Sequence, residues 1–359
     1  MFNSELKVSA PGRLCLLGEH QDYFGLPIIA AAIDLRVTIQ GKSRPDRIFS
    51  LDLPDIGEKD EFALEKEIKY LQERDYLRSV INVLRRKKVL ISRGWDCRIQ
   101  GTIPINSGTS SSSAMVIAWI KFLLEAAKDK KAKCPEDIAE LGFLSEVAEF
   151  KEPGGKMDHY ASSLGGVVNV YSGENFSVRQ FDQPLKEFVL ADSLIRKNTT
   201  GTLSHIKNNV LAGINKVKRR LKDFNLSSPM GFEEKHEIEK LPEVEKRLLK
   251  GTLKTRDITA EGEKLFMSNS FDHHHFGDLL SRQQEVMRDY LKISTPKLNK
   301  MIETTLENGA LGAKINGSGL GGCIFAYAPS KADLIAEELR KLDTKVYIVR
   351  VDEGARVEN

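Results

Sequence analysis

The chain has 359 residues, enough for two domains of about 150 residues each. Its 54 Lys and Arg residues nearly balance 51 Asp and Glu residues, so the charge gives no reason to expect a nucleic-acid partner. The four cysteines lie far apart without CxxC spacing, which argues against a zinc site or a disulfide framework, and no apolar stretch is long enough to span a membrane. We therefore expect a cytoplasmic protein, a monomer or a homodimer, without nucleic-acid or membrane partners.

The first third of the chain is predicted to consist mainly of strands. Residues 6–18 and 27–41 contain short apolar or alternating runs that are bounded or broken by proline and glycine. A helix is expected over residues 76–90, because apolar side chains recur there at helical spacing. A short strand at residues 95–104 then leads into a run of serines.

The serine run is "PINSGTSSSSAMV", residues 104–116. A flexible linker would have polar neighbours, whereas Met115, Trp119 and Phe122 form the apolar face of a helix that starts within the run. Unpaired backbone N–H groups and the helix dipole at such an N-terminus attract phosphate. The alternative is a long N-cap without a ligand. The run is not a Walker loop, because it lacks the GK[ST] ending.

The remainder of the chain mixes helices and strands. A second helix is predicted at residues 135–149, and a strand at residues 167–172. The succession of strands followed by helices starts again with a strand near residue 188, so we place a domain boundary near residue 185. This gives two α+β domains, residues 1–185 and 186–359. After several long helices, the closing section is predicted as helix, strand, helix and strand at residues 295–309, 313–329, 331–342 and 345–353.

A group of charged residues occupies a short turn between two apolar strands, in "APGRLCLLGEHQDYFG", residues 10–25. Arg13, Glu19, His20 and Asp22 are poor core residues, so they either belong to a solvated loop or hold the hydroxyl or phosphate groups of a ligand.

Two more stretches contain residues of a possible active site. The glycine-rich "NGSGLGGC" at residues 316–323 is a tight turn or bulge when considered alone. In "EPGGKMDHYASS", Asp158 opens a helix, and Glu146 lies on the preceding helix; each is also an ordinary helix acid. Two carboxylates, a serine hydroxyl and an anion site together suffice for magnesium-assisted phosphoryl transfer.

In this order, the three motifs resemble those of the GHMP kinases, the superfamily of galactokinase, homoserine kinase, mevalonate kinase and phosphomevalonate kinase. "PINSGTSSSS" is similar to the central loop P-x-x-x-G-L-S-S-S-A, with Thr109 for the leucine and Ser113 for the alanine. Galactokinase is the most similar branch. Its signature G-R-x-N-L-I-G-E-H-T-D-Y-N-G aligns without gaps to "GRLCLLGEHQDYFG", and "EVAEFKEPGGKMD" has the galactokinase spacing between Glu146 and Asp158.

The resemblance implies an α+β GHMP kinase fold. Its N-terminal domain would be like ribosomal protein S5 domain 2, with an unusual left-handed βαβ crossover. A ferredoxin-like C-terminal domain would follow, and the active site would lie between the two. The implied cofactors are ATP and Mg²⁺, and the implied small-molecule partner is a sugar.

The resemblance also implies a role for individual residues. Asp158 would be the catalytic base beside the acceptor hydroxyl, and Arg13 would keep it ionised. Ser112 and Glu146 would position Mg²⁺. The sugar would be held by Arg13, Glu19, His20, Asp22, Gly155 and Asp158. ATP would be held by Pro104, Asn106, Ser107, Gly108, Thr109, Ser110, Ser111, Ser112, Gly319 and Gly321.

The chain departs from galactokinases where those enzymes contact the sugar. A tyrosine expected after the catalytic region is missing from residues 192–210, and Cys15, Gln21 and Gly154 replace signature residues. The leading hypothesis is an ATP-dependent kinase for the anomeric hydroxyl of galactose or a related monosaccharide. The alternatives are a kinase of the heptose phosphate or mevalonate type, or a catalytically silent sugar sensor.

Overall fold

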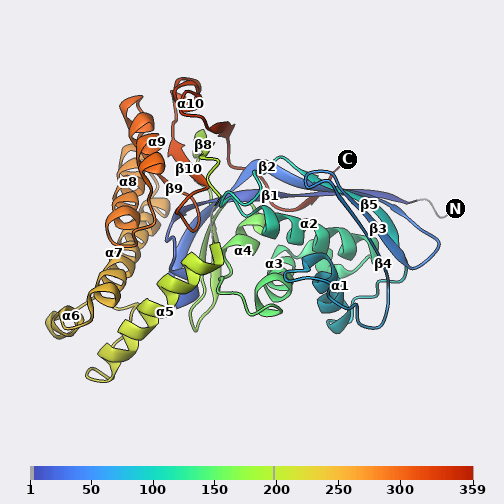
Figure 1. Ribbon diagram of the computed structural model, residues 1–359, viewed down its shortest axis with the longest axis horizontal. Coiled ribbons are helices and arrows are strands. Elements are labelled where there is room, and N and C mark those ends of the chain that lie inside the picture. The colour runs from blue at the N-terminus through green and yellow to red at the C-terminus, as the bar shows by residue number, and fades with distance from the viewer. Residues whose placement is uncertain (1–3, 197–198, 359) are drawn as a thin grey trace.

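The computed structural model describes residues 4–196 and 199–358, which form two β-sheets with associated helices (Figure 1). The first sheet has eight strands in the order β12-β1-β2-β5-β3-β4, with β6 on β2 and β7 on β6. All its pairs are antiparallel except β3 with β5. The strands are β1 (Glu5–Leu17), β2 (Pro27–Ser43), β3 (Ile48–Leu53), β4 (Glu58–Ala63), β5 (Trp95–Gly101), β6 (Val167–Tyr171), β7 (Ser177–Phe181) and β12 (Arg356–Val357).

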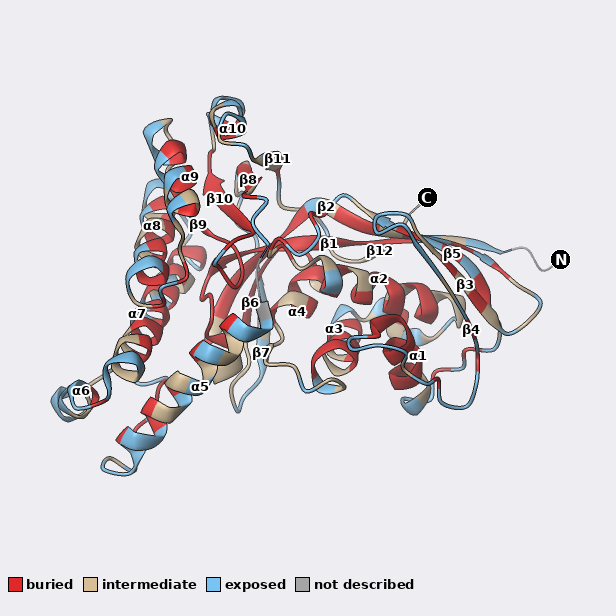
Figure 2. Cartoon of the chain, in the orientation of Figure 1, coloured by how far each residue is buried: buried red, intermediate tan, exposed pale blue. Residues whose placement is uncertain are grey.

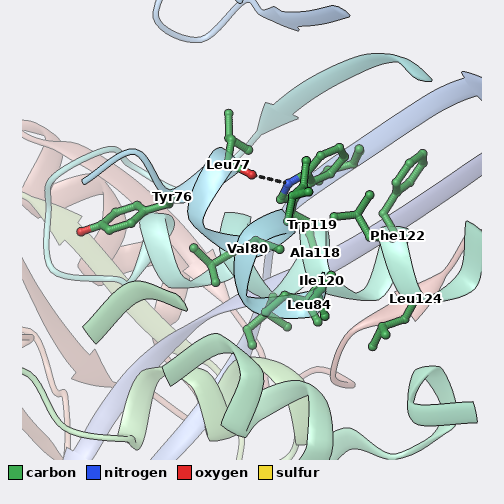
Figure 3. Close-up of a cluster of buried hydrophobic side chains, with 14 of the residues drawn as sticks. Tyr76, Leu77, Val80, Leu84, Ala118, Trp119, Ile120, Phe122 and Leu124 are labelled. Carbon is green, nitrogen blue, oxygen red and sulfur yellow. Dashed lines mark hydrogen bonds between the residues drawn. The ribbon is translucent and has the colours of Figure 1, made fainter. Parts of the chain in front are cut away.

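Four helices cover one face of the first sheet (Figure 1). Trp119 is fully buried at the centre of the core they form, and its indole Nε1 donates a hydrogen bond of 3.0 Å to the Leu77 carbonyl (Figure 3). The bond joins α1 to α2, so the indole fixes the position of the helix that follows the serine run. These helices are α1 (Tyr76–Arg86), α2 (Ser111–Ala126), α3 (Pro135–Phe143) and α4 (Met157–Leu164).

Strand β1 is buried on both faces. Leu14 and Leu16 belong to a core that the first sheet shares with the second half of the chain, whereas Cys15 packs toward α4. A register shift between Cys15 and Leu17 places Leu17 in the same shared core as Leu16. The strand therefore carries Arg13 into the junction between the two sheets.

The second sheet is antiparallel, with four strands in the order β11-β8-β10-β9. Its helices bury one face toward the sheet and toward each other and expose the opposite face (Figure 2), and the buried faces contribute apolar residues to a common core. In the described parts of the chain, no helix combines the length and the apolar character needed to cross a bilayer. The elements are β8 (Phe188–Asp192), α5 (Thr199–Lys218), α6 (Phe232–Glu239), α7 (Glu243–Phe266), α8 (His273–Asp289), α9 (Pro296–Glu307), β9 (Gly312–Ile315), β10 (Cys323–Tyr327), α10 (Ala332–Arg340) and β11 (Lys345–Val349).

The end of the chain returns to the first sheet. Strand β12 pairs with β1, and the buried Arg36 donates hydrogen bonds to the Asp352 carboxylate (2.7 Å) and the Gly354 carbonyl (2.7 Å). We keep the proposed boundary near residue 185 and add that residues 351–357 pack on the first domain.

Two sequence predictions need correction, and four strands were missed. Residues 313–329 form two strands, β9 and β10, because the glycines between them make a loop rather than extended backbone. The helix predicted at residues 135–149 ends at Phe143 and continues as a π-helical turn, Leu144–Ala148. The missed strands are β3, β4, β7 and β12, which have mixed polar sequences or, for β12, only two residues.

Replacing Trp119 with alanine is predicted to destabilise the fold by about 3–5 kcal/mol, the usual loss for a large buried aromatic side chain. The substitution leaves a cavity and an unpaired Leu77 carbonyl. Chemical denaturation of the variant measures the loss. Leu90→Ala is the control, because Leu90 is 78% exposed and its loss should change stability by less than about 0.5 kcal/mol. Equal effects of the two substitutions would contradict this assignment of the core.

Candidate active site

A buried ion pair joins strand β1 to helix α4. The Arg13 Nε donates to the Asp158 Oδ1 at 2.7 Å, and its Nη1 donates to the Gly108 carbonyl at 2.6 Å. The Arg13 side chain is 5% exposed, while the Asp158 side chain is 29% exposed. The carboxylate can therefore contact a ligand while the guanidinium holds it from behind.

The charge on Asp158 follows from two opposing effects. Burial alone would raise the pKa of Asp158, but the adjacent Arg13 lowers it below the ordinary value. Asp158 also lies in the first turn of α4, where the helix dipole favours a negative charge. The pKa of Arg13 is lowered by burial and raised more strongly by Asp158 and Glu19. Both members of the pair are thus charged at neutral pH.

The serine run forms a loop that ends at the N-terminus of α2. A helix starts within the run, as predicted; it begins at Ser111, and Ser110 adopts a left-handed backbone conformation with φ of 59°. No side-chain hydrogen bond caps this end of α2, so the long N-cap interpretation is not supported. The free N–H groups of the first turn and the positive end of the helix dipole make this an anion site.

The glycine-rich loop lies against the serine loop. The Cys323 amide donates to the Ser107 carbonyl at 2.7 Å, and a Cβ on Gly322 would come within 2.4 Å of the same carbonyl oxygen. Gly319 and Gly321 have positive φ and approach the carbonyls of Ile293 and Ile195. These two glycines therefore shape the loop, whereas Gly317 and Ser318 line the cavity beside it.

The turn after β1 supplies the polar groups on the opposite wall. Asp22 is 7% exposed, and its pKa is raised to about 6, first by burial and then by the negative charge of Asp158. A Cβ on Gly155 would lie 1.9 Å from Asp22 Oδ2, so only glycine fits there. His20 Nδ1 lies 3.2 Å from the Tyr23 hydroxyl.

Glu19 is held by residues that the sequence analysis did not single out. Its Oε2 accepts a hydrogen bond of 2.9 Å from Lys314 Nζ, and its Oε1 accepts one of 3.0 Å from the Gly317 amide. Lys314 is fully buried and also donates to the Cys15 carbonyl at 2.8 Å. Asn316, two residues later, accepts from the Cys15 amide. No sequence signal identifies Lys314, because it lies in a short strand outside every motif that the sequence analysis found.

Glu146 lies on the π-helical turn and is 6% exposed. Its Oε2 is 2.8 Å from the His159 Nε2. A π-helical turn adds one residue to the helix, which changes the direction of the side chains that follow. Ser112 lies in the first turn of α2 and lines the same cavity as Glu146. One carboxylate and one hydroxyl beside an anion site match the few protein ligands that Mg²⁺ usually takes.

Most of the predicted residues line one cavity of about 210 Å³. Pro104, Thr109, Gly319 and Gly321 are not on its wall; Thr109 is buried and accepts a hydrogen bond from the Arg13 amide at 3.2 Å. Some of the missed wall residues come from segments without a motif, and the others lie inside the quoted stretches but were not singled out there. The predicted residues on the wall are Arg13, Glu19, His20, Asp22, Asn106, Ser107, Gly108, Ser110, Ser111, Ser112, Glu146, Gly155 and Asp158. The missed residues include Tyr23, Arg74, Tyr76, Glu152, His159, Thr200 and Leu203.

Three domain families match the chain. Residues 75–166 match the GHMP kinase N-terminal domain, residues 265–344 match the GHMP kinase C-terminal domain, and residues 1–43 match the galactokinase galactose-binding signature. Among curated relatives, the galactokinase of Thermococcus kodakarensis is 28% identical and aligns over 98% of this chain and 100% of its own length. The galactokinase of Mannheimia succiniciproducens is 26% identical over 94% of this chain and 88% of its own.

Solved structures show the same fold. The galactokinase of Lactococcus lactis, solved with galactose, has a TM-score of 0.85 over 98% of this chain and 95% of its own, at 20% identity. The mevalonate kinase of Methanococcus jannaschii has a TM-score of 0.76 over 98% of this chain and 99% of its own, at 21% identity. The chain therefore belongs to the GHMP kinase superfamily and is a galactokinase-like phosphotransferase with an alcohol group as acceptor.

Proposed function

We propose that the protein transfers the γ-phosphoryl group of ATP to the anomeric C1 hydroxyl of galactose or a related monosaccharide, with Asp158 as the catalytic base. The observation that carries this proposal is the Arg13–Asp158 pair facing a helix N-terminus across one cavity. A sugar-binding protein without catalytic activity would have no need for an ionised carboxylate supported in this way.

The chemistry assigned to Asp158 is proton transfer. As the acceptor oxygen attacks the γ-phosphorus, the proton of the hydroxyl moves to the Asp158 carboxylate. A new C1–O–P linkage forms, the bond between the γ-phosphorus and the bridging oxygen breaks, and ADP leaves. Arg13 keeps Asp158 ionised before the reaction and reduces negative charge near the transferring group.

The phosphate groups of ATP are assigned to the N-terminus of α2. The serine loop and the first turn of α2 line the cavity through Asn106, Ser107, Gly108 and residues 110–113, and Gly317 and Ser318 line it from the loop after β9. Since the serine and glycine loops are bonded to each other through Cys323 and Ser107, the two loops would enclose the phosphates as one unit.

Mg²⁺ would be held by Ser112 and Glu146. The ion, when bound, would neutralise phosphate charge and orient the γ-phosphoryl group. The hydrogen bond from His159 Nε2 orients the Glu146 carboxylate and leaves its Oε1 without a hydrogen bond to any other described residue. The residues present therefore fit this ion.

The acceptor is assigned to the wall formed by Glu19, His20, Asp22 and Gly155. Carboxylate oxygens accept hydrogen bonds from sugar hydroxyls, and two fixed carboxylates can discriminate between hydroxyl orientations. The match to the galactose-binding signature supports galactose as the first substrate to test. Residues 192–210 lack the tyrosine expected of galactokinases, and from this stretch Thr200 and Leu203 of α5 line the cavity, which is why a related sugar stays within the proposal.

A kinase assay across a substrate panel tests the proposed activity. ADP release should accompany galactose or another aldose, and the product should lose its reducing end because phosphate blocks C1. Asp158→Asn should lower the rate by about 10²–10⁴-fold while nucleotide binding, measured by calorimetry, is retained. Turnover of mevalonate or a heptose phosphate alone, or binding of galactose and ATP without ADP release, would contradict the proposal.

Acceptor affinity should depend on the ionisation of Asp22. Because the pKa of Asp22 is raised to about 6, the carboxylate becomes protonated as pH falls through that value and loses acceptor capacity. We expect the KM for galactose to rise below about pH 6, by up to about tenfold per pH unit. Steady-state kinetics from pH 5 to 8 measure this, with the KM for ATP as the internal control. If the KM for galactose of Asp22→Asn rose just as steeply as pH falls, Asp22 would not be the titrating group of the acceptor site.

Glu146→Gln is predicted to raise the Mg²⁺ concentration for half-maximal rate by about tenfold, because an amide oxygen is a weaker ligand for this ion than a carboxylate. Calorimetric titration of Mg²⁺ with ADP should show the same weakening without turnover. Glu136→Gln, at an exposed position in the first turn of α3, is the control. An unchanged Mg²⁺ requirement in Glu146→Gln would exclude Glu146 as a ligand.

A further inference from the structure

A second and larger cavity lies away from the phosphate loop. Its volume is about 960 Å³, and none of its lining residues lines the candidate active site. It is formed by the start of β2, the hairpin of β6 and β7, the segment 227–230, and helices α6 and α7. Its volume is at the upper end of the range of about 300–1,000 Å³ that is typical of small-molecule sites.

The lining of this cavity includes a buried asparagine whose side-chain oxygen has no hydrogen-bond partner in the described parts of the chain. Asn169 is the central residue of β6 and is only 7% exposed. Its Oδ1 is buried without a hydrogen-bond partner in the described parts of the chain. A buried amide left unpaired costs about 1–3 kcal/mol, so a ligand that hydrogen-bonds Asn169 recovers that loss.

The walls combine apolar, aromatic and basic groups. Leu26, Ile238 and Leu253 are buried apolar residues of the lining, and Tyr171 and Tyr290 add aromatic rings. Such walls pack against a ring system rather than against a simple ion.

The charges around the cavity favour an anion. Five basic and three acidic residues line it, and two of the acidic residues are already paired, Glu239 with Lys250 and Asp257 with Arg256. Lys235 and Lys254 make no ion pair with a described carboxylate, and Lys254 Nζ lies 5.3 Å from the Tyr290 ring centroid. Two lysine side chains in a lining that also has apolar and aromatic residues match a phosphate attached to a ring.

The cavity is directly connected to the acceptor loop. Gln21, between His20 and Asp22, is fully buried and donates its Nε2 to the Pro27 carbonyl (2.5 Å) and to Thr259 Oγ1 of α7 (3.2 Å). Pro27 lines the cavity, and so do Asp257 and Ala260, the second residue before Thr259 and the residue after it. A ligand that moves either wall would therefore act on the loop that carries His20 and Asp22.

We propose that this cavity is a second ligand site for a phosphorylated ring compound, a nucleotide or a sugar nucleotide, and that its occupation changes the affinity of the acceptor site through Gln21. The binding part goes beyond the proposed kinase activity and does not depend on it.

Calorimetry on the full chain tests the site, with AMP, UMP, UDP-glucose and inorganic phosphate as probes. An excess of non-hydrolysable ATP analogue occupies the nucleotide site of the kinase. At least one ring-bearing probe should bind, with about tenfold weaker binding in Asn169→Leu and in Lys254→Glu. Lys300→Glu, an exposed lysine on α9 outside both cavities, should bind as the parent chain does.

The outcomes separate the two proposals. Failure of every ring-bearing probe to bind, binding of phosphate alone, or binding that Asn169→Leu and Lys254→Glu leave unchanged would overturn the second site, whatever the kinase assay shows. The connection through Gln21 is tested by the Kd of galactose with and without the bound probe, which should differ by about threefold or more in the parent chain and not in Gln21→Ala. An equal Kd in the parent chain would overturn that connection.

Discussion

Lys314 is a fully buried lysine, and its ammonium group has to be neutralised where it stands. The neutralising group is Glu19 at the end of β1, and the Cys15 carbonyl accepts a second hydrogen bond. An unpaired charge at this depth would cost several kcal/mol, so the second sheet can dock on the first only where β9 meets the end of β1. The arrangement of the candidate active site depends on this docking.

Several contacts of the site follow from the position of β9. The Gly317 amide reaches the other oxygen of Glu19, and the Asn316 side chain donates to the Gly108 carbonyl (2.9 Å) that also accepts from Arg13. The glycine loop, the serine loop and Arg13 are thus tied together by residues of β9 and of the loop that follows it. Because residues from both halves of the chain line the candidate active site, neither half contains it alone. The second cavity likewise has walls from both halves, which is why one loop can connect the two.

The sequence was most informative where function restricts the residue type. The serine run predicted a helix start, and α2 begins at Ser111. Arg13 and Asp158, 145 positions apart, were paired through the family resemblance and lie 2.7 Å apart. Strands β4 and β7 were missed because they lie at sheet edges, where their polar residues face solvent and leave a weak alternating pattern. The π-helical turn at Glu146 was missed because it has the composition of an ordinary helix.

The sequence by itself determined the superfamily and the helices of the core, because these depend on local periodicity and on short motifs whose residue types are nearly fixed by their task. Only the tertiary structure decided that Glu19 is paired with Lys314, that Glu146 contacts His159, and that Asn169, whose Oδ1 has no hydrogen-bond partner among the described residues, lines a second cavity. Each of these depends on how distant segments pack. No periodicity or spacing in the sequence reveals the partner of a buried lysine, histidine or asparagine. The free-energy cost of burying such a side chain can be assessed only when the groups around it are known.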